Sequence, residues 1–157
     1  MTALPNATSD APFAITSNSL DAGLGHIFGH YSPDFLAKEK IFHKLLVQMK
    51  RNVEASGARF EVALIPIDFM VQPKKMDILM PNSKYRHAQP VYYQRLSMFL
   101  RRNNIRYVDI GAAMNTVEHK DFFAKTGDVH FNPNGHRFAA ETIYDFLNNE
   151  NIIASAP

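Results

Sequence analysis

Two short apolar segments alternate along this chain with three segments whose apolar residues recur at helical spacing. In chain order, the pattern predicts a helix, a strand, a helix, a strand and a final helix over 32–57, 60–65, 90–103, 107–110 and 132–147. Strands that alternate with helices are typical of a parallel sheet with helices packed against it. The order therefore favours the α/β fold class. Because a helix connects the two strands, we expect them to be parallel neighbours.

The first helix has clear start and stop signals. Ser32 suits the N-cap and Pro33 suits the first helical position. Asp34 lies at the positive end of the helix dipole, and Gly57 is a natural stop. We expect the apolar side chains of this helix to face the core; they are Phe35, Ile41, Phe42, Leu45, Leu46, Met49 and Val53.

The segments between these elements are less regular. Residues 60–65 are nearly all apolar, as in a strand that is covered on both faces, and Pro66 ends the run. Residues 66–88 contain prolines and polar clusters without a clear period, which predicts a long surface loop. Gly111 is expected to break the second strand, and an irregular stretch follows it.

Length and composition limit the class of protein. The chain has 157 residues, of which 46% are apolar and 20% charged, the usual balance of one globular domain. A net charge of +2 is too small to predict a nucleic-acid partner, and the absence of Cys excludes disulfides and thiol nucleophiles. No run of about 18 apolar residues exists, so we expect no membrane span. The compartment is left open.

The domain organisation follows from the same patterns. We expect a flexible lead-in over 1–31, a folded domain over 32–150 and a tail over 151–157. Two strands are few, because sheets of this type usually have about four to six. We therefore expect a sheet that is incomplete at its N-terminal side. An open strand edge invites pairing, so we expect either self-association or completion by a missing N-terminal half.

The segment 127–136, GDVHFNPNGH, carries the most chemical information. Asp128 and His130 are two residues apart, a spacing that can project both side chains to the same side of an extended turn. The turn precedes the last helix, at the end of the sheet where α/β proteins place their sites. A carboxylate that holds one imidazole nitrogen leaves the other to act as a general base toward a hydroxyl.

This segment resembles the last sequence block of the SGNH (GDSL-type) hydrolase superfamily, in which an Asp and a His precede an Asn-Pro-x-Gly-His helix start. Residues 127–147, GDVHFNPNGHRFAAETIYDFL, match this pattern through Ala139-Ala140, and the resemblance covers about residues 35–147. Upstream, ASGARFEVALIP and IRYVDI follow the same order of elements. The Asp-x-His spacing is similar to the branch that contains alginate-type O-acetyltransferases. The family's Gly-Asp-Ser nucleophile block has no counterpart here, so the chain resembles the C-terminal half of the domain.

The resemblance implies a three-layer α/β/α, flavodoxin-like fold with a parallel sheet. It also implies serine acyl transfer on an ester, by a hydrolase, esterase or acyltransferase that acts on a small molecule or on carbohydrate O-acetyl groups. In that mechanism His130 takes the proton of a serine and Asp128 orients the imidazole. No cofactor is required. The alternative is an inactive, truncated or degenerate domain that acts as a binding or scaffold module.

Other readings of the polar residues remain open. Ser17, Ser19 and Ser32 are the upstream candidates for a nucleophile, although an N-cap role explains Ser32 better. A zinc site would need Asp128, His130 and His136, but this set lacks a partner from a second helix, so we expect no metal.

The remaining polar residues have simpler interpretations. His136 is expected to be structural, and the pair His26 and His30 to be incidental. The three histidines not yet mentioned are expected to be surface residues; they are His43, His87 and His119. The pairs Lys50-Arg51 and Arg101-Arg102 are expected to be helix-end charges.

Overall fold

The computed structural model of the chain describes residues 24–79, 81–85, 88, 90–118, 121–124 and 129–149. Its two strands, β1 (Glu61–Leu64) and β2 (Arg106–Asp109), form a parallel sheet in which Val62 lies opposite Tyr107. The predicted parallel pairing is thus confirmed. The fold is mixed helix and strand with a small parallel sheet, in agreement with the predicted α/β class.

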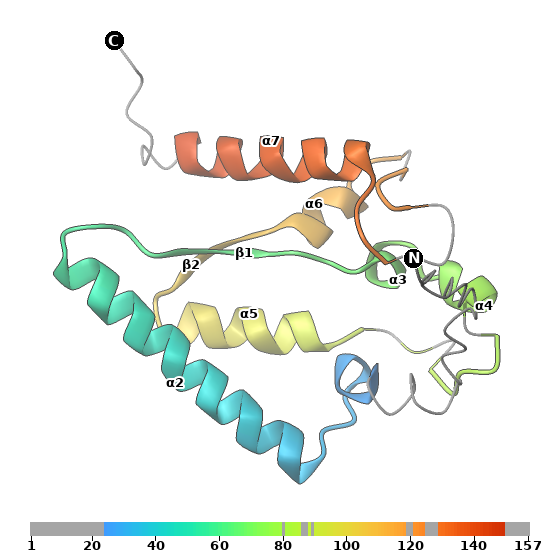
Figure 1. Cartoon of the computed structure of the whole chain (residues 1–157), viewed down its shortest axis with the longest axis horizontal. Coiled ribbons are helices and arrows are strands. Elements are labelled where there is room, and N and C mark those ends of the chain that lie inside the picture. The colour runs from blue at the N-terminus through green and yellow to red at the C-terminus, as the bar shows by residue number, and fades with distance from the viewer. Residues whose placement is uncertain are drawn as a thin grey trace, which may run out of the picture.

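Helices lie on both sides of the strands. Figure 1 shows α7 (Pro133–Asn149) on one side and α5 (Tyr92–Arg102), which connects β1 to β2, on the other. The core between the strands and α5 also includes a residue of α2; its buried members are Leu46, Leu64, Leu96, Leu100 and Ile105. A second core lies beneath α7, with buried members Val71, Ile110, Met114, Phe122, Phe123 and Ala139.

The start of α2 (Pro33–Ala55) follows the predicted signals. The Ser32 hydroxyl accepts a hydrogen bond from the Phe35 N–H at 3.1 Å, and Pro33 occupies the first helical position. Beyond the last turn, Gly57 has φ +81°, a left-handed conformation that a glycine adopts at little cost. Both the N-cap role of Ser32 and the stop at Gly57 are confirmed.

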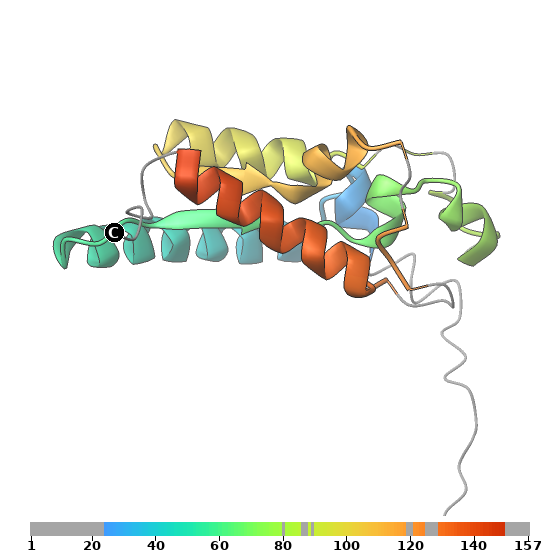
Figure 2. The ribbon, with the colours of Figure 1, turned by 90° about the horizontal axis from the view of Figure 1, so that it is seen from above.

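The predicted inward face of α2 is partly wrong. Leu46 is buried against α5, but four of the other apolar side chains are exposed; they are Ile41 (60%), Phe42 (42%), Leu45 (56%) and Met49 (51%). The helix has apolar residues on two adjacent sides, and the described elements cover only one of them. Seen from above, α2 runs along the β1 side of the molecule (Figure 2).

The strand β1 is also less covered than predicted. Ala63 is exposed, and Ile65, just after the strand, is 47% exposed. The reason is that α7 packs against β2. Among the described residues β2 is the only strand that pairs with β1, which leaves one edge of β1 open.

The described part of the segment 66–88 is not a surface loop. It contains two short helices, α3 (Asp68–Val71) and α4 (Lys75–Leu79), and Phe69 is 3% exposed. Phe69 stacks against Phe28 of the short 3-10 helix η1 (Gly25–Phe28), with ring centroids 6.0 Å apart. The described part of the expected lead-in 1–31 therefore contributes to the core, whereas residues 1–23 and 150–157 lie outside the described residues.

A further helix, α6 (Ile110–Asn115), follows β2 directly, where an irregular stretch was expected. It begins because the Asp109 carboxylate accepts a hydrogen bond from the Ala112 N–H at 2.9 Å, which caps the helix. Gly111 lies inside α6, where a Cβ atom would come within 3.1 Å of the Pro66 ring. Within the described ranges, none of the helices is both long and apolar enough to span a bilayer.

Candidate functional site

Residues 121–124 and 129–132, which we call the His130 turn, lie just before α7. Phe123 pairs with Phe131 in an antiparallel bridge, and the Ala124 N–H donates a hydrogen bond to the His130 carbonyl at 3.1 Å. The backbone of His130 is therefore held against the opposite side of the turn. Its side chain is exposed. Asp128 lies outside the described residues, so its predicted pairing with His130 stays a prediction.

Asn132 connects the two sides of the His130 turn to α7. Its side-chain Oδ1 accepts a hydrogen bond from the Gly135 N–H at 2.9 Å and so caps the helix. Its Nδ2 group donates to the carbonyls of Asp121 and Phe123, each at 3.2 Å. Its backbone N–H donates to the Phe122 carbonyl at 3.0 Å. One side chain thus fixes where the turn ends and where α7 begins.

Gly135 is required by a close backbone approach. A Cβ atom at this position would lie 2.0 Å from the Phe122 carbonyl oxygen. The Asn-Pro-x-Gly part of the motif is therefore explained by packing: Asn132 caps, Pro133 starts the helix, and Gly135 lets it contact the turn. The start of this helix at Asn132 and Pro133 was predicted from the sequence and is confirmed, whereas the close approach at Gly135 was not predicted.

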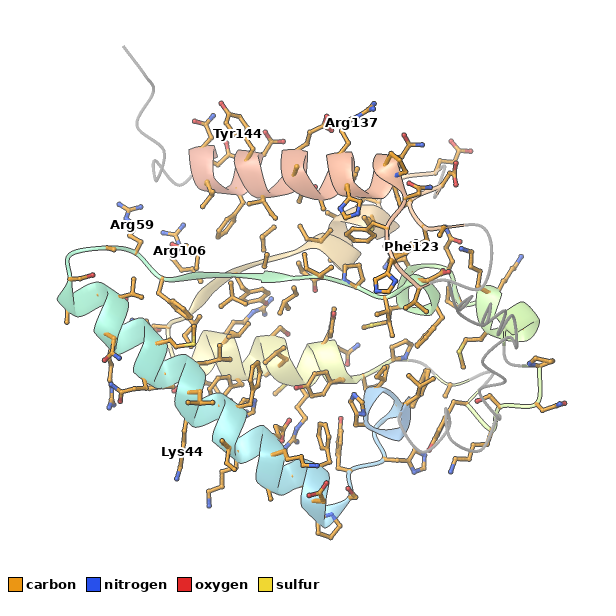
Figure 3. The ribbon with its side chains drawn as sticks, in the orientation of Figure 1. Lys44, Arg59, Arg106, Phe123, Arg137 and Tyr144 are labelled. Carbon is orange, nitrogen blue, oxygen red and sulfur yellow. The ribbon has the colours of Figure 1, made fainter. Side chains whose placement is uncertain are left out.

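The His130 turn lies at the end of the sheet where the strands lead into α3 and α6 (Figure 1). Figure 3 shows Phe123 close to the start of α7 at this end. The Phe123 side chain is 1% exposed, and its ring lies 5.1 Å from that of Phe131. The turn is therefore anchored in the core under α7, while the His130 side chain faces out.

His136 contacts the same turn through its ring. The imidazole meets the Phe131 ring edge-on, with centroids 5.7 Å apart. This contact is consistent with the structural role expected for His136. Among the described residues, no three His, Asp or Glu side chains lie together as metal ligands. The set with Asp128 is not tested by this, because Asp128 is not among them.

The pair His26 and His30 has separate neighbours. The His26 ring stacks on Phe35 at 4.9 Å, whereas the His30 ring lies 5.1 Å from that of Tyr85. The two rings therefore pack on different aromatic partners, which agrees with an incidental pair.

The prediction that His43 is a surface residue is wrong. Its ring is half-buried and stacks on Phe99 of α5 at 3.7 Å, and burial lowers the pKa of the imidazole. Sequence pattern missed this because His43 lies at the margin of the covered side of α2. His87 and His119 lie outside the described residues.

The basic pairs differ in their positions. Arg101 and Arg102 lie in the last turn of α5, as expected. Lys50 and Arg51 do not lie in the last turn of α2, because that helix continues to Ala55. The Lys50 ammonium instead pairs with the Glu54 carboxylate four residues on, at 2.6 Å.

The serine candidates are only partly described. Ser32 caps α2, whose start lies across the sheet from the start of α7 (Figure 1). A side chain that caps a helix there is poorly placed to meet His130. Ser17 and Ser19 lie outside the described residues.

An ion pair next to the His130 turn was missed by sequence reasoning. Asp68, the first residue of α3, is fully buried, and its Oδ2 atom lies 2.7 Å from the Lys75 Nζ atom. Burial raises the pKa of the Asp68 carboxyl, and the hydrogen bond from Lys75 opposes that rise. The signal available in the sequence was an acidic residue just after a strand, inside a segment interpreted as a loop.

The larger hollows of the surface lie elsewhere. Two of them, of 670 and 490 Å³, lie at the contact of α2 with α5, and neither is lined by a residue of the His130 turn. Between them the Glu39 carboxylate receives two hydrogen bonds from the Arg95 guanidinium, each of 2.7 Å. This pair lowers the pKa of Glu39 and joins the two helices.

Comparison with known families agrees with the resemblance seen in the motif. The family described as SGNH hydrolase-like domain, acetyltransferase AlgX, matches residues 36–157. No curated protein and no solved structure matches the chain. The family match covers most of the chain, including both strands and the whole His130 turn. This chain therefore belongs to the family of SGNH hydrolase-like domains of the AlgX acetyltransferase type.

Proposed function

We propose that this chain carries the acid–base part of an SGNH-type esterase or O-acyltransferase that works by serine acyl transfer. The observation that carries the proposal is the His130 turn: a member of this family places His130 on a turn anchored at the end of the sheet where strands lead into helices. Sites of α/β proteins are formed at this end. Carbohydrate O-acetyl groups are the substrate class that the family suggests.

In the proposed mechanism, Asp128 accepts a hydrogen bond from one imidazole nitrogen of His130, and the other nitrogen faces a serine hydroxyl. His130 takes the serine proton as the serine oxygen attacks the ester carbonyl. The imidazolium then gives this proton to the departing alcohol, which leaves an acyl-serine. Water or an acceptor hydroxyl attacks the acyl-serine in turn, and His130 accepts its proton and returns it to the serine. The two outcomes are hydrolysis and acyl transfer.

The nucleophile in this proposal is a serine from polypeptide outside these 157 residues, because the chain has no Gly-Asp-Ser block. The open edge of β1 supports this arrangement, since a further strand can pair there. The α2 helix lies on the β1 side (Figure 2), and its exposed apolar side chains offer the same neighbour a surface to cover. The complete domain would then be a three-layer α/β/α fold.

The acid–base pair can be tested without the nucleophile. If Asp128 accepts a hydrogen bond from His130, that imidazole N–H is protected from exchange with water and gives a distinct downfield proton resonance. We expect Asp128→Asn to abolish this resonance. The matched control, His136→Gln, alters another histidine of the same motif and should leave it unchanged. A resonance that is absent in the unsubstituted chain, or that survives Asp128→Asn, would contradict the pair.

Hydrolysis of an activated acetyl ester tests the chemistry. We expect little turnover by this chain, because a general base without a nucleophile and an oxyanion hole loses most of the rate. A robust rate that survives His130→Ala would place the site elsewhere. A robust rate abolished by His130→Ala would instead show a nucleophile within the chain, and Ser17 and Ser19 would be tested first.

A further inference from the structure

The pair Asp68 and Lys75 is an unusual feature for the interior of a small domain. The Asp68 side chain is 1% exposed and that of Lys75 24% exposed. Only one carboxylate oxygen is used, because Oδ1 of Asp68 is buried without a hydrogen-bond partner among the described residues. A buried ion pair adds little stability compared with apolar residues of similar size. This pair also leaves a buried acceptor without a hydrogen bond, so a gain in stability does not explain why it is present.

The second hydrogen bond of Lys75 supplies that explanation. Its ammonium group donates to the Ala124 carbonyl at 3.2 Å, and it lies 5.8 Å from the centroid of the Phe123 ring. Ala124 is 49 residues away in sequence and belongs to the His130 turn. Its own N–H donates to the His130 carbonyl at 3.1 Å. A chain of three polar contacts thus joins the buried carboxylate to the backbone of His130.

The geometry of these contacts favours a fixed position for the turn. Asp68 lies at the start of α3, four residues after β1 ends, so its place is set by the sheet. The carboxylate in turn sets the position of the Lys75 ammonium, because a charge-assisted hydrogen bond of 2.7 Å is strong and short. Lys75 needs no contact with Ala124 to reach Asp68. Because the ammonium group is held by Asp68, its hydrogen bond to the Ala124 carbonyl makes the position of the His130 turn depend on that of β1.

We propose that Asp68 and Lys75 are positioning residues, which tie the His130 turn to the carboxyl end of β1 and thereby set where the His130 imidazole points. This inference rests on the proposed function for the role of that imidazole. The two residues touch neither substrate nor the reacting atoms. Their effect is to hold the backbone at Ala124 and His130.

The test separates positioning from stability with two variants. Lys75→Met removes both hydrogen bonds and leaves Asp68 unpaired, so we expect a lower free energy of unfolding and a loosened turn. The double variant Asp68→Asn/Lys75→Met leaves no unpaired buried charge, so its stability should return toward that of the unsubstituted chain. Its turn should stay loose, because the bond to Ala124 is still missing. Lys75→Arg keeps a charged donor, so it should preserve both the free energy of unfolding and the fixed position of the turn.

Amide hydrogen exchange at Ala124 reports on the turn, because this N–H donates across it. Relative to amides inside α7, we expect exchange at Ala124 to be about tenfold faster in Lys75→Met and in the double variant, equivalent to about 1.4 kcal/mol. The exposed neighbour Lys74 provides the control, since Lys74→Met should leave the exchange rate unchanged. The His130 imidazole N–H resonance should weaken in the same two variants and in neither Lys75→Arg nor Lys74→Met.

Two results would overturn the inference. The first is unchanged exchange at Ala124 in Lys75→Met. The second is recovery of normal exchange in the double variant together with stability, which would make the pair a stability element only. If Lys75→Met does not fold, the double variant decides. The exchange rate at Ala124 depends on neither an ester substrate nor the Asp128 side chain. A failure of this test can therefore be distinguished from a failure of the proposed acid–base pair.

Discussion

The substitution Gly135→Ala tests most directly how the His130 turn and α7 fit together. The new Cβ atom would lie 2.0 Å from the Phe122 carbonyl oxygen, whereas real Cβ contacts are essentially never below 3.0 Å. The start of α7 and the turn must therefore separate by about 1 Å at this point. Such a shift stretches the hydrogen bond from the Asn132 N–H to Phe122, now 3.0 Å, beyond the usual limit.

The expected loss follows from these contacts. Two or three hydrogen bonds of Asn132 are strained, and each is worth about 1 kcal/mol. Alanine favours a helix over glycine by about 1 kcal/mol, which offsets part of the loss. We therefore expect Gly135→Ala to lower the free energy of unfolding by about 1 to 2 kcal/mol, measured by urea denaturation followed by circular dichroism.

The control for this prediction is the neighbouring exposed residue, Asn134. We expect Asn134→Ala to change the free energy of unfolding by less than about 0.5 kcal/mol, because its side chain is exposed. If Gly135→Ala proves as stable as the unsubstituted chain, or more stable, the close approach between α7 and Phe122 is absent and our account of the motif is wrong.

Three other predictions concern the rest of the fold. Arg95→Met should lower the free energy of unfolding at pH 7 by about 2 kcal/mol, which is less than for a fully buried pair because Arg95 is 45% exposed. Since Arg95 lowers the pKa of Glu39, this difference between the two proteins should shrink as the pH falls below about 4, and an equal loss in urea melts at pH 3 and pH 7 would contradict the prediction. Burial raises the pKa of Tyr93 to about 12, so stability should fall as the pH rises from about 10 to 12, and ultraviolet titration should show a late-ionising tyrosine that Tyr93→Phe lacks. Leu45→Glu, on the exposed apolar side of α2, should reduce self-association seen by light scattering; a strictly monomeric unsubstituted chain would refute the expectation.

Local signals predicted much of the framework correctly. Ser32 and Gly57 marked the ends of α2 because a cap and a left-handed glycine act on the adjacent turn alone. The parallel pairing of the strands followed from the helix that connects them. The segment with His130 was identified in the same way, since residue types at short spacing can be read without knowing what surrounds them.

The short helices α3 and α4 were not predictable from pattern. They have four and five residues, little more than one turn each, so the helical spacing of apolar residues cannot recur within them. Their burial depends on partners that are remote in sequence, as when Phe69 stacks on Phe28. The two apolar sides of α2 present the same difficulty, because spacing cannot tell which side other elements cover.

In the candidate site, too, some features were predictable from the sequence and others only from the fold. Sequence alone was enough to identify Asp128 and His130 as an acid–base hypothesis and to place them before the last helix. The reason for Gly135, the branching bonds of Asn132 and the contact of Lys75 with Ala124 appeared only in the folded chain. Caps, turns and motif spacing are properties of neighbouring residues, whereas close approach and tethering arise between segments that the chain brings together only when it folds.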